Sequence, residues 1–365
     1  MRKRILALTM ALCLFLAACS AGTATPSPEP TPTPAATPTP TPTPAPEPTP
    51  YNGPVNPLTG LPIEEKWVNA RPIAVMLNNV KEAQPQLGQS QADIIYEVLV
   101  EGGITRMLGV YQTVEEVGTI GSVRSSRPYY LELALGHDAV YLHAGGSEDA
   151  YSKIKAWGVT ALDCVRGPYE GSKPGSNLFW RDADRIKNNG SVHSVVTTGE
   201  TIIEKFAGYS LRQEHKEGYT YPQTFVENGT PVNGEDAATI TVPFSNYKTG
   251  IFTYDEEMGK YLVSQYKKPY VDGNDGSQVA VTNVIILKAD CHIIPGDDAG
   301  RLAVDLTSGG EGWYACGGKM VPITWSKADR NSPFIYTDGA GETLALQKGN
   351  SYVSIVPLDC EISTE

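Results

Sequence analysis

The sequence has few of the residues and patterns that mark metal sites or nucleic-acid surfaces. Only five of its 365 residues are histidine and only six are cysteine. Cys164, Cys291, Cys316 and Cys360 lack the close spacing of zinc ligands, and no His-Glu-x-x-His pattern occurs. The formal net charge of −12 opposes nucleic-acid binding, which needs a basic face. We therefore predict no metal, no cofactor and no nucleic-acid partner.

Long apolar runs are also absent, apart from one short run near the N-terminus. Arg2, Lys3 and Arg4 precede an apolar stretch over residues 5–18, as in a secretory signal, and this stretch is shorter than a bilayer span requires. It ends in Leu-Ala-Ala-Cys19, which resembles a bacterial lipobox. Residues 1–18 are therefore expected to be removed, leaving Cys19 as the lipidated N-terminus. The alternative is an ordinary signal peptide followed by a chance cysteine.

Residues 19–51 are predicted to form a proline-rich linker after the lipid. Twelve of the 31 residues from Ser20 to Pro50 are proline, a composition that favours extended polyproline II over a packed core. At about 3.1 Å per residue this linker reaches up to roughly 95 Å. We expect a protein that is lipid-anchored at the extracytoplasmic face of a bacterial cell membrane and works in or near the cell wall.

The rest of the chain is long enough for two domains. Residues 52–215 are predicted to form an α/β (or α+β) N-terminal domain, with strands over 71–79, 92–101, 104–111 and 138–143 and helices over 129–135, 148–157 and 199–207. Residues 219–360 are predicted to form a mainly antiparallel β-rich domain, with strands over 238–243, 249–255, 260–266, 279–287, 300–306, 312–315, 320–325 and 352–357. In an oxidising compartment the four cysteines of these domains can pair in three ways, and simple burial stays open as well.

The stretch over residues 121–147 carries the most chemistry. Arg124 and Arg127 precede an expected helix, and the Gly145-Gly146 turn leads to Ser147, a suitable N-cap for the next helix. Two helix N-termini and two guanidinium groups would then lie close together, and both favour an anion. The alternative is that the arginines are surface charges and the glycines are tight turns.

An acidic and apolar segment precedes this stretch. Asp93, Glu97 and Glu101 recur at a spacing of four, which places them on one face whether the segment is a strand or a helix. The Gly102-Gly103 turn and a return strand carrying Arg106 predict a hairpin. This hairpin would bring Arg106 near Glu101 and Glu97.

Several motifs resemble one bacterial family. They are Asn-Pro-Leu-Thr-Gly-Leu-Pro, Arg-Pro-Ile-Ala-Val-Met-Leu-Asn-Asn, Ala-Asp-Ile-Ile-Tyr-Glu, Glu-Gly-Gly-Ile-Thr-Arg, Gly-Ser-Val-Arg-Ser-Ser-Arg-Pro and His-Ala-Gly-Gly-Ser, in this order. Together they resemble the YerB-like lipoproteins, the domain of unknown function 3048, over about residues 52–357. The resemblance implies an envelope lipoprotein with N- and C-terminal domains and supplies no activity. That family usually reads Pro-His-Asn where this chain has Val192-His193-Ser194, so a ligand-orienting role of that asparagine is in doubt here.

A set of polar side chains is the candidate binding or catalytic site. We expect several of them to converge on one cleft, where the Gly145-Gly146 turn lets a ligand approach the backbone. The alternative is a structural network of buried arginine–carboxylate pairs. The candidates are Asp93, Glu97, Glu101, Arg106, Arg124, Arg127, His143, Ser147, Arg181, Arg185 and His193.

Several chemistries are open to this set. Ser147 with a histidine could act as a nucleophile, although the Gly-x-Ser-x-Gly elbow is missing, and paired glutamates could serve a glycosidase. A metal site from Asp93, Glu97 and His143 has no motif to support it. Arginines around a phosphate or pyrophosphate are the more concrete idea. We predict an envelope protein that binds an anionic ligand, with an enzyme of wall-polymer metabolism or an interaction scaffold as alternatives and the oligomeric state left open.

Overall fold

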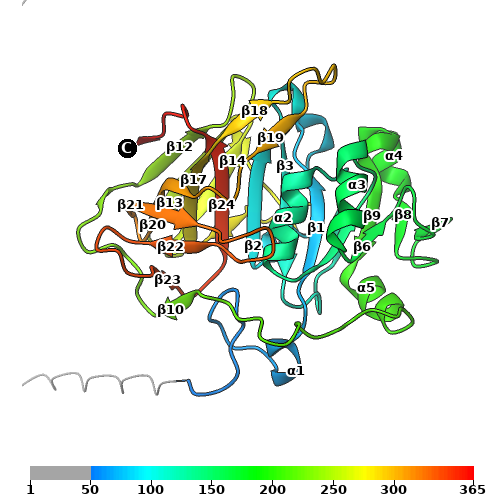
Figure 1. Ribbon diagram of the computed structural model, residues 1–365, viewed down its shortest axis with the longest axis horizontal. Helices are drawn as coiled ribbons and strands as arrows, with labels where there is room; N and C mark the ends of the chain where they lie inside the picture. Colours follow the sequence, from blue (N-terminus) through cyan, green and yellow to red (C-terminus); the bar gives the residue numbers. More distant parts are fainter. Residues whose placement is uncertain (1–50) are drawn as a thin grey trace, which may run out of the picture. The chain divides into compact units, whose positions relative to one another are not determined.

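One 11-stranded sheet takes strands from both halves of the chain (Figure 1). The computed structural model describes residues 51–365, so the predicted signal peptide, Cys19 and the proline-rich linker lie outside the described residues. Residues Tyr51–Glu365 form one compact unit. None of the helices described within it has the length and apolar character needed to cross a membrane.

The N-terminal half contributes five strands, and two helices pack beside them. The strands are β1 (Ile73–Asn78), β2 (Ile94–Leu99), β3 (Thr105–Tyr111), β5 (Val140–His143) and β6 (Ala161–Asp163), and the helices are α2 (Pro128–Gly136) and α3 (Glu148–Trp157). β2 and β3 form the expected hairpin, and β3 also pairs antiparallel with β1. β1, β5 and β6 run parallel, and α3 provides the crossover that parallel strands require between β5 and β6.

A four-stranded sheet lies outside this arrangement. Its strands follow the order β4 (Thr119–Gly121), β9 (Val195–Thr198), β8 (Phe179–Arg181) and β7 (Glu170–Gly171), and helices α4 (Ala183–Asn189) and α5 (Gly199–Phe206) belong to the same part of the chain. The Thr198 side chain accepts a hydrogen bond from the N–H of Thr201 and so caps α5. The helix expected after Thr198 is therefore confirmed.

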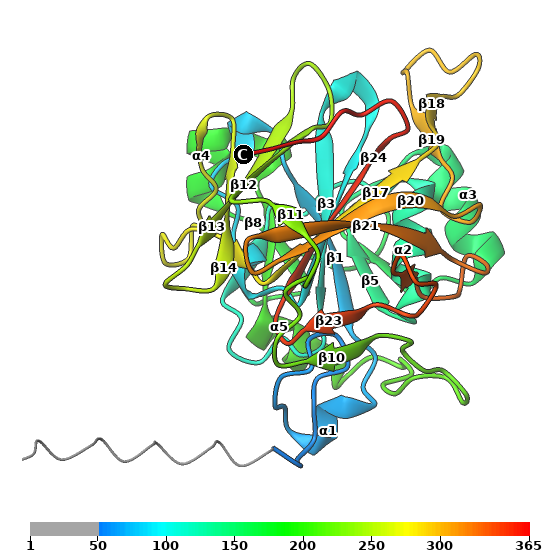
Figure 2. The ribbon, with the colours of Figure 1, turned by 90° about the vertical axis from the view of Figure 1, so that its left-hand side faces the viewer.

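The C-terminal half supplies the other six strands of the large sheet. They are β11 (Glu235–Asp236), β17 (Asn283–Ala289), β20 (Gly310–Cys316), β21 (Lys319–Ser326), β22 (Ile335–Thr337) and β24 (Ser351–Pro357). The order is β11-β21-β20-β17-β24-β2-β3-β1-β5-β6, with β22 paired to β21. β24 therefore lies between β17 and β2, and it runs parallel to both. Figure 2 shows how strongly the sheet twists between β21 and β1.

A second, wholly antiparallel sheet covers part of the first. It contains β12 (Thr239–Pro243), β13 (Thr249–Asp255), β14 (Lys260–Gln265), β15 (Lys268–Pro269), β16 (Ala280–Val281) and β25 (Ser363–Thr364). Shorter elements complete the structure: α1 (Glu65–Val68), the pair β10 (Thr224–Val226) and β23 (Ala345–Gln347), the pair β18 (Cys291–Ile293) and β19 (Leu302–Val304), and the single-turn helices η1 (Lys81–Ala83), η2 (Gln89–Gln91), η3 (Glu101–Gly103) and η4 (Ser191–His193). The predicted class, a mixed α/β half followed by an antiparallel β half, is confirmed. The division into two domains stays a prediction, and the two segments share the large sheet.

The large sheet is covered on both faces. All six residues of β1 are buried, and alternate side chains enter different cores. Val75 and Leu77 belong to a core shared with Phe252 of the second sheet, and Ala74 and Met76 belong to a core shared with α2. This double burial explains why the strand reads as a continuous apolar run.

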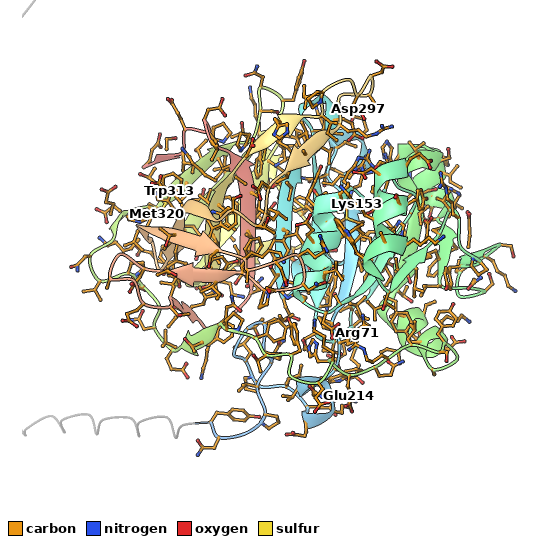
Figure 3. All side chains as sticks on the ribbon, viewed as in Figure 1. Arg71, Lys153, Glu214, Asp297, Trp313 and Met320 are labelled. Carbon is orange, nitrogen blue, oxygen red and sulfur yellow. The ribbon has the colours of Figure 1, made fainter. Side chains whose placement is uncertain are left out.

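A connecting segment after α5 returns along the ends of β1 and β5. The Arg71 side chain ties these parts together, because its Nε donates to the carbonyl of Asp138 at 2.6 Å and its Nη1 to the carbonyl of Arg212 at 3.2 Å. Figure 3 shows Arg71 and Glu214 at this end of the structure. The chain reaches its C-terminal half from here.

All four cysteines of the described residues are free thiols. Cys164, Cys316 and Cys360 are buried, and burial raises the pKa of Cys164 to about 12. Such thiols are poor nucleophiles at neutral pH. Of the two possibilities that the sequence leaves open, the structure has free thiols, three of them buried.

Candidate functional site

A cavity of about 330 Å³ lies beyond the carboxyl ends of β5 and β6. The turn after β5, the loop after β6 and the segment before α2 line it, which is the usual position of ligand sites in sheets with parallel strands. The polar lining consists of Arg124, Arg166, Arg181 and the Gly145–Gly146 turn, with Ser125 and Tyr151 beside them. Valine and alanine side chains complete the wall.

The turn after β5 is held by one carboxylate at the end of β6. Oxygens of Asp163 accept hydrogen bonds from the N–H groups of Gly145 at 2.7 Å and Arg166 at 3.0 Å, and from the hydroxyl of Tyr151 at 2.8 Å. Although burial opposes it, hydrogen bonds from the N–H groups of Gly145 and Val165 and from Tyr151 lower the pKa of Asp163. Gly145 has φ +80°, a conformation that favours glycine. Asp163 therefore fixes both loops of the cavity, and the sequence-based candidate set omits it.

His143 also stabilises the turn after β5. It is fully buried at the end of β5, with Nδ1 2.8 Å from the Gly145 carbonyl oxygen and 3.7 Å from Asp163. Burial lowers the pKa of His143, so the ring is neutral at physiological pH and Nδ1 donates to Gly145. Nε2 has no hydrogen-bond partner among residues 51–365. His143 does not line the cavity, and its contacts are those of a positioning residue.

Arg124 is the most constrained cation of the cavity. Its N–H donates to the carbonyl of Met76 in β1, and its own carbonyl accepts from the N–H of Ala144, so its backbone bridges β1 and the turn after β5. Its side chain is half-buried, and Nη1 donates to the carbonyl of Val192 at 2.8 Å. Within the described chain Nε has no hydrogen-bond partner and no carboxylate pairs with the guanidinium. Burial and two neighbouring arginines lower the pKa of Arg124 to about 10, so it stays charged at neutral pH.

Arg166, on the loop after β6, and Arg181, at the end of β8, are exposed and line the cavity with Arg124. The Arg166 guanidinium lies 3.7 Å from the centre of the Tyr151 ring and pairs with Glu148. Arg181 donates to Glu170 at 2.9 Å and to the carbonyl of Ser191 at 2.9 Å. Neither glutamate lines the cavity. The lining therefore carries three guanidinium groups, and no described aspartate or glutamate belongs to it.

Two further arginines hold the segment that carries Arg124. Arg127 donates from Nε to Glu101 at 3.0 Å, and Arg106 donates to the same carboxylate at 3.2 Å. Arg106 also donates to the carbonyl of Ser125 at 2.6 Å. The predicted contact of Arg106 with Glu101 is confirmed. Because one carboxylate serves two cations, the neighbourhood of Arg124 keeps an excess of positive charge.

Other predicted site residues have structural contacts near this region. The hydroxyl of Ser147 accepts from the N–H of Ala150 and caps α3, as expected. Arg185 donates to three backbone carbonyls, at 2.7 and 2.8 Å, and His193 lies 2.8 Å from Asn78 of β1. None of these three lines the cavity.

The expected helix N-termini do not act as anion sites here. The first turn of α3 carries Glu148 and Asp149, whose charges oppose an anion at that end. At α2 the N-cap is Arg127, which is occupied by Glu101. The positive charge of the cavity thus comes from side chains.

The three acidic residues expected on one face lie in three separate surroundings. Asp93 accepts from Asn56 at 2.9 Å and from the N–H of Gln112 at 2.6 Å, and burial raises its pKa to about 6. Glu97 is fully buried in β2 and contacts other polar residues. Glu101 lies beyond the strand in a single helical turn. The prediction of a shared face is wrong because β2 ends at Leu99, and Glu97 contacts Thr105 instead of the expected Arg106.

Comparison with known proteins identifies the family of this fold, a mixed α/β half joined through one sheet to an antiparallel β half. Residues 58–212 match the profile "Protein of unknown function (DUF3048) N-terminal domain", and residues 240–353 match the corresponding C-terminal domain. The chain belongs to this family, as its motifs indicate.

One curated relative and one solved structure agree with this assignment. The chain is 34% identical over 307 residues to "Putative lipoprotein YerB" of Bacillus subtilis (strain 168), covering 82% of this chain and 86% of that protein. It is also similar to the crystal structure of YerB from Bacillus subtilis, with a TM-score of 0.71 and 31% identity over 85% of this chain and 99% of that one. At this identity the similarity extends to the fold of both halves.

Proposed function

We propose that this chain is a lipid-anchored envelope protein that binds an anionic ligand of the cell envelope in the cavity around Arg124. The lipoprotein description of the relative from Bacillus subtilis and the lipobox at Cys19 support the anchor and the extracytoplasmic location. The family description gives no activity.

The observation that carries the binding proposal is the pairing state of Arg124. Its half-buried guanidinium borders the cavity and has no carboxylate partner among the described residues, so an anion in the cavity would meet a cation that the fold leaves unpaired. Arg166 and Arg181 add donors from two other segments. Guanidinium groups favour phosphate and carboxylate because their planar donors bind two oxygens at once.

The size and lining of the cavity limit the ligand. A volume of about 330 Å³ is at the small end of ordinary ligand sites. The valine walls leave room for an apolar or sugar face beside the anion. A phosphate, a pyrophosphate or the charged end of a wall fragment fits these limits.

The lining favours binding over catalysis. No histidine, aspartate or glutamate of the described chain lines the cavity, and a hydrolase or transferase needs a general base within hydrogen-bond reach. His143 and Ser147 have structural contacts instead. The enzyme of wall-polymer metabolism thus has less support than the binding protein.

A thermal unfolding screen tests the proposal. Inorganic pyrophosphate and phosphate-bearing wall fragments are added to the wild type, to Arg124→Gln and to Arg301→Gln, a control in which a half-buried arginine outside the cavity is lost. A binding anion should raise the melting temperature of the wild type and the control, and not that of Arg124→Gln. Equal shifts in all three proteins, or no shift with any probe, would overturn the proposal.

A further inference from the structure

A closed polar cluster lies on the other face of the large sheet, between β2 and the second sheet. Its centre is Glu97, which is 0% exposed, and Lys248, which is 1% exposed. Asn79, at the end of β1, is also fully buried there. The chain thus buries an amine, a carboxylate and a carboxamide together, although each is normally solvated.

The three groups meet at a single oxygen atom. The Nζ of Lys248 lies 2.8 Å from Oε1 of Glu97, and the Nδ2 of Asn79 donates to the same oxygen at 2.8 Å. The two nitrogen atoms are therefore at most twice that distance apart. Thr105 donates to Oε1 at 2.6 Å and Tyr352 donates to Oε2 at 2.5 Å, so the carboxylate is held in one orientation.

Burial of the amine favours its neutral, nucleophilic form, against the effect of Glu97 and of two aromatic ring faces. Rings of Phe244 and Tyr266 lie 5.3 and 5.7 Å from Nζ, and Glu97 is the only acidic group within ion-pair distance of it among the described residues. Burial lowers the pKa of Lys248, although Glu97 opposes this effect. A desolvated amine that can pass its proton to an adjacent carboxylate is an activated nucleophile.

The surroundings of Asn79 activate its carbonyl carbon. Its Oδ1 accepts a hydrogen bond from Nε2 of Gln265 at 2.8 Å and a longer one from Nε2 of Gln84 at 3.4 Å. Donors at this oxygen stabilise the negative charge that develops there when a nucleophile attacks the carbon. Its Nδ2 faces Glu97, which can supply the proton that a leaving amine needs.

From this arrangement we propose that Lys248 and Asn79 form an intramolecular isopeptide bond, with Glu97 as the proton carrier. The ammonium of Lys248 first gives a proton to the carboxylate of Glu97. The neutral Nζ attacks Cγ of Asn79, and the oxyanion at Oδ1 is held by Gln265. Glu97 passes its proton to Nδ2 and takes up the second proton of Nζ, the bond from Cγ to Nδ2 breaks, ammonia leaves, and Glu97 is left protonated. One amide replaces another, so no oxidant or co-reactant is needed.

The geometry of the chain gives this bond a structural role. It would join the end of β1 to the loop between β12 and β13, so it would tie the N-terminal half to the C-terminal half. A cavity of about 340 Å³, lined by Gln84, Gln265 and Tyr266, borders the cluster and offers ammonia a way out. A plain buried ion pair uses Glu97 and Lys248 and gives no role to the neighbouring carboxamide.

Peptide mapping of the purified chain tests the proposal. If Lys248 is modified, trypsin does not cleave after it, and peptide 217–260 is recovered joined to peptide 67–81. The joined species should be about 17 Da lighter than the two peptides together, because ammonia is lost. Separate, unmodified peptides from the folded wild type would overturn the proposal, and this result does not depend on any variant folding.

Three variants assign the roles. Lys248→Arg should remove the joined species, Glu97→Gln should reduce it at least tenfold, and Lys319→Arg, which alters an exposed ion pair, should leave it unchanged. A species joined to peptide 82–106 and about 18 Da lighter would show that Glu97 itself acylates Lys248, and it would overturn the assignment of Asn79. A wild-type level of the joined species in Glu97→Gln would overturn the role of Glu97.

Discussion

Arg124 and Lys248, the latter before its proposed bond to Asn79 forms, are two basic side chains held against the same large sheet, and they have opposite surroundings. Arg124 borders a cavity, and among the described residues no carboxylate pairs with it. Lys248 is enclosed, with Glu97 at 2.8 Å and aromatic rings on two sides. The first arrangement leaves positive charge available to a ligand, and the second satisfies the charge within the fold.

The position of each cation on the sheet explains the difference. Arg124 lies on the segment before α2, beyond the carboxyl ends of parallel strands, where it borders an open cavity. Glu97 lies in the middle of β2, and the second sheet covers its face. A charge in a strand that is covered on both faces must be paired, whereas a charge at the end of a strand can stay unpaired until a ligand binds.

The largest effect is expected from breaking the enclosed pair. Lys248→Met removes the proposed bond to Asn79 and leaves Glu97 as an uncompensated buried charge, which alone should lower the free energy of unfolding by about 3–5 kcal/mol. Lys319→Met removes an exposed partner of Asp236 and should cost about 0–1 kcal/mol. Denaturant unfolding of both variants measures the difference, and similar costs would show that the cluster is not held by its charges.

Variants of Arg124 and Arg185 distinguish a role in ligand binding from a role in stabilising the fold. Arg124→Gln should weaken anion binding roughly 10- to 100-fold, since a charge-assisted hydrogen bond contributes about 1.5–3 kcal/mol. Arg185→Gln should instead lower stability by about 1–3 kcal/mol, because three backbone carbonyls lose their donor. Calorimetric titration of both variants with pyrophosphate checks this, with Arg185→Gln keeping the wild-type affinity. If Arg185→Gln weakened anion binding and Arg124→Gln lowered only stability, Arg185 would be the ligand-binding residue and Arg124 the structural one.

His137 and His193 should make the stability of the protein depend on pH to different extents. Burial lowers the pKa of His137 to about 3, from an ordinary value near 6.5. The unfolded chain therefore takes up a proton that the folded chain refuses, so stability present above pH 6.5 is lost as the pH falls. This should cost about 2 kcal/mol at pH 5 relative to pH 8.

The variants His137→Gln and His193→Gln measure this effect. His137→Gln should flatten the fall in stability between pH 8 and pH 5. His193 is half-buried, and burial and Arg124 also lower its pKa, so His193→Gln should flatten the curve less. Denaturant midpoints across this pH range provide the measurement, and an unchanged slope in His137→Gln would contradict the burial effect.

Local features of the fold followed from the sequence, and its long-range pairings did not. Alternating and apolar runs located β1, β2, β3 and β13 closely, because each pattern reflects the burial of its own strand. No local pattern places β24 between β17 and β2, since parallel neighbours far apart in the chain leave no turn signature. The joining of the two halves by one sheet was therefore not predictable.

The candidate site shows the same limit. Arg124, Arg181 and the Gly145–Gly146 turn were expected near one another and do line one cavity. Asp163 and Arg166 were missed, although a carboxylate at the end of an apolar strand is a usable signal. Glu97 also carried a signal, because a lone charge inside Ile-Ile-Tyr-Glu-Val-Leu-Val demands a buried partner. That partner is about 150 residues away, and spacing cannot identify it.

The smallest effect is expected at Ser147, where a role in capping α3 can be distinguished from a role in binding a ligand. Its hydroxyl accepts from the N–H of Ala150, so Ser147→Ala should cost about 1 kcal/mol of stability through the lost cap. Thr198→Ala removes the equivalent cap from α5, away from the cavity, and should cost a similar amount. Anion affinity should be unchanged in both variants. A loss of binding or turnover in Ser147→Ala alone, beyond its loss of stability, would mean that the hydroxyl acts on a ligand, and it would restore the catalytic alternative for this site.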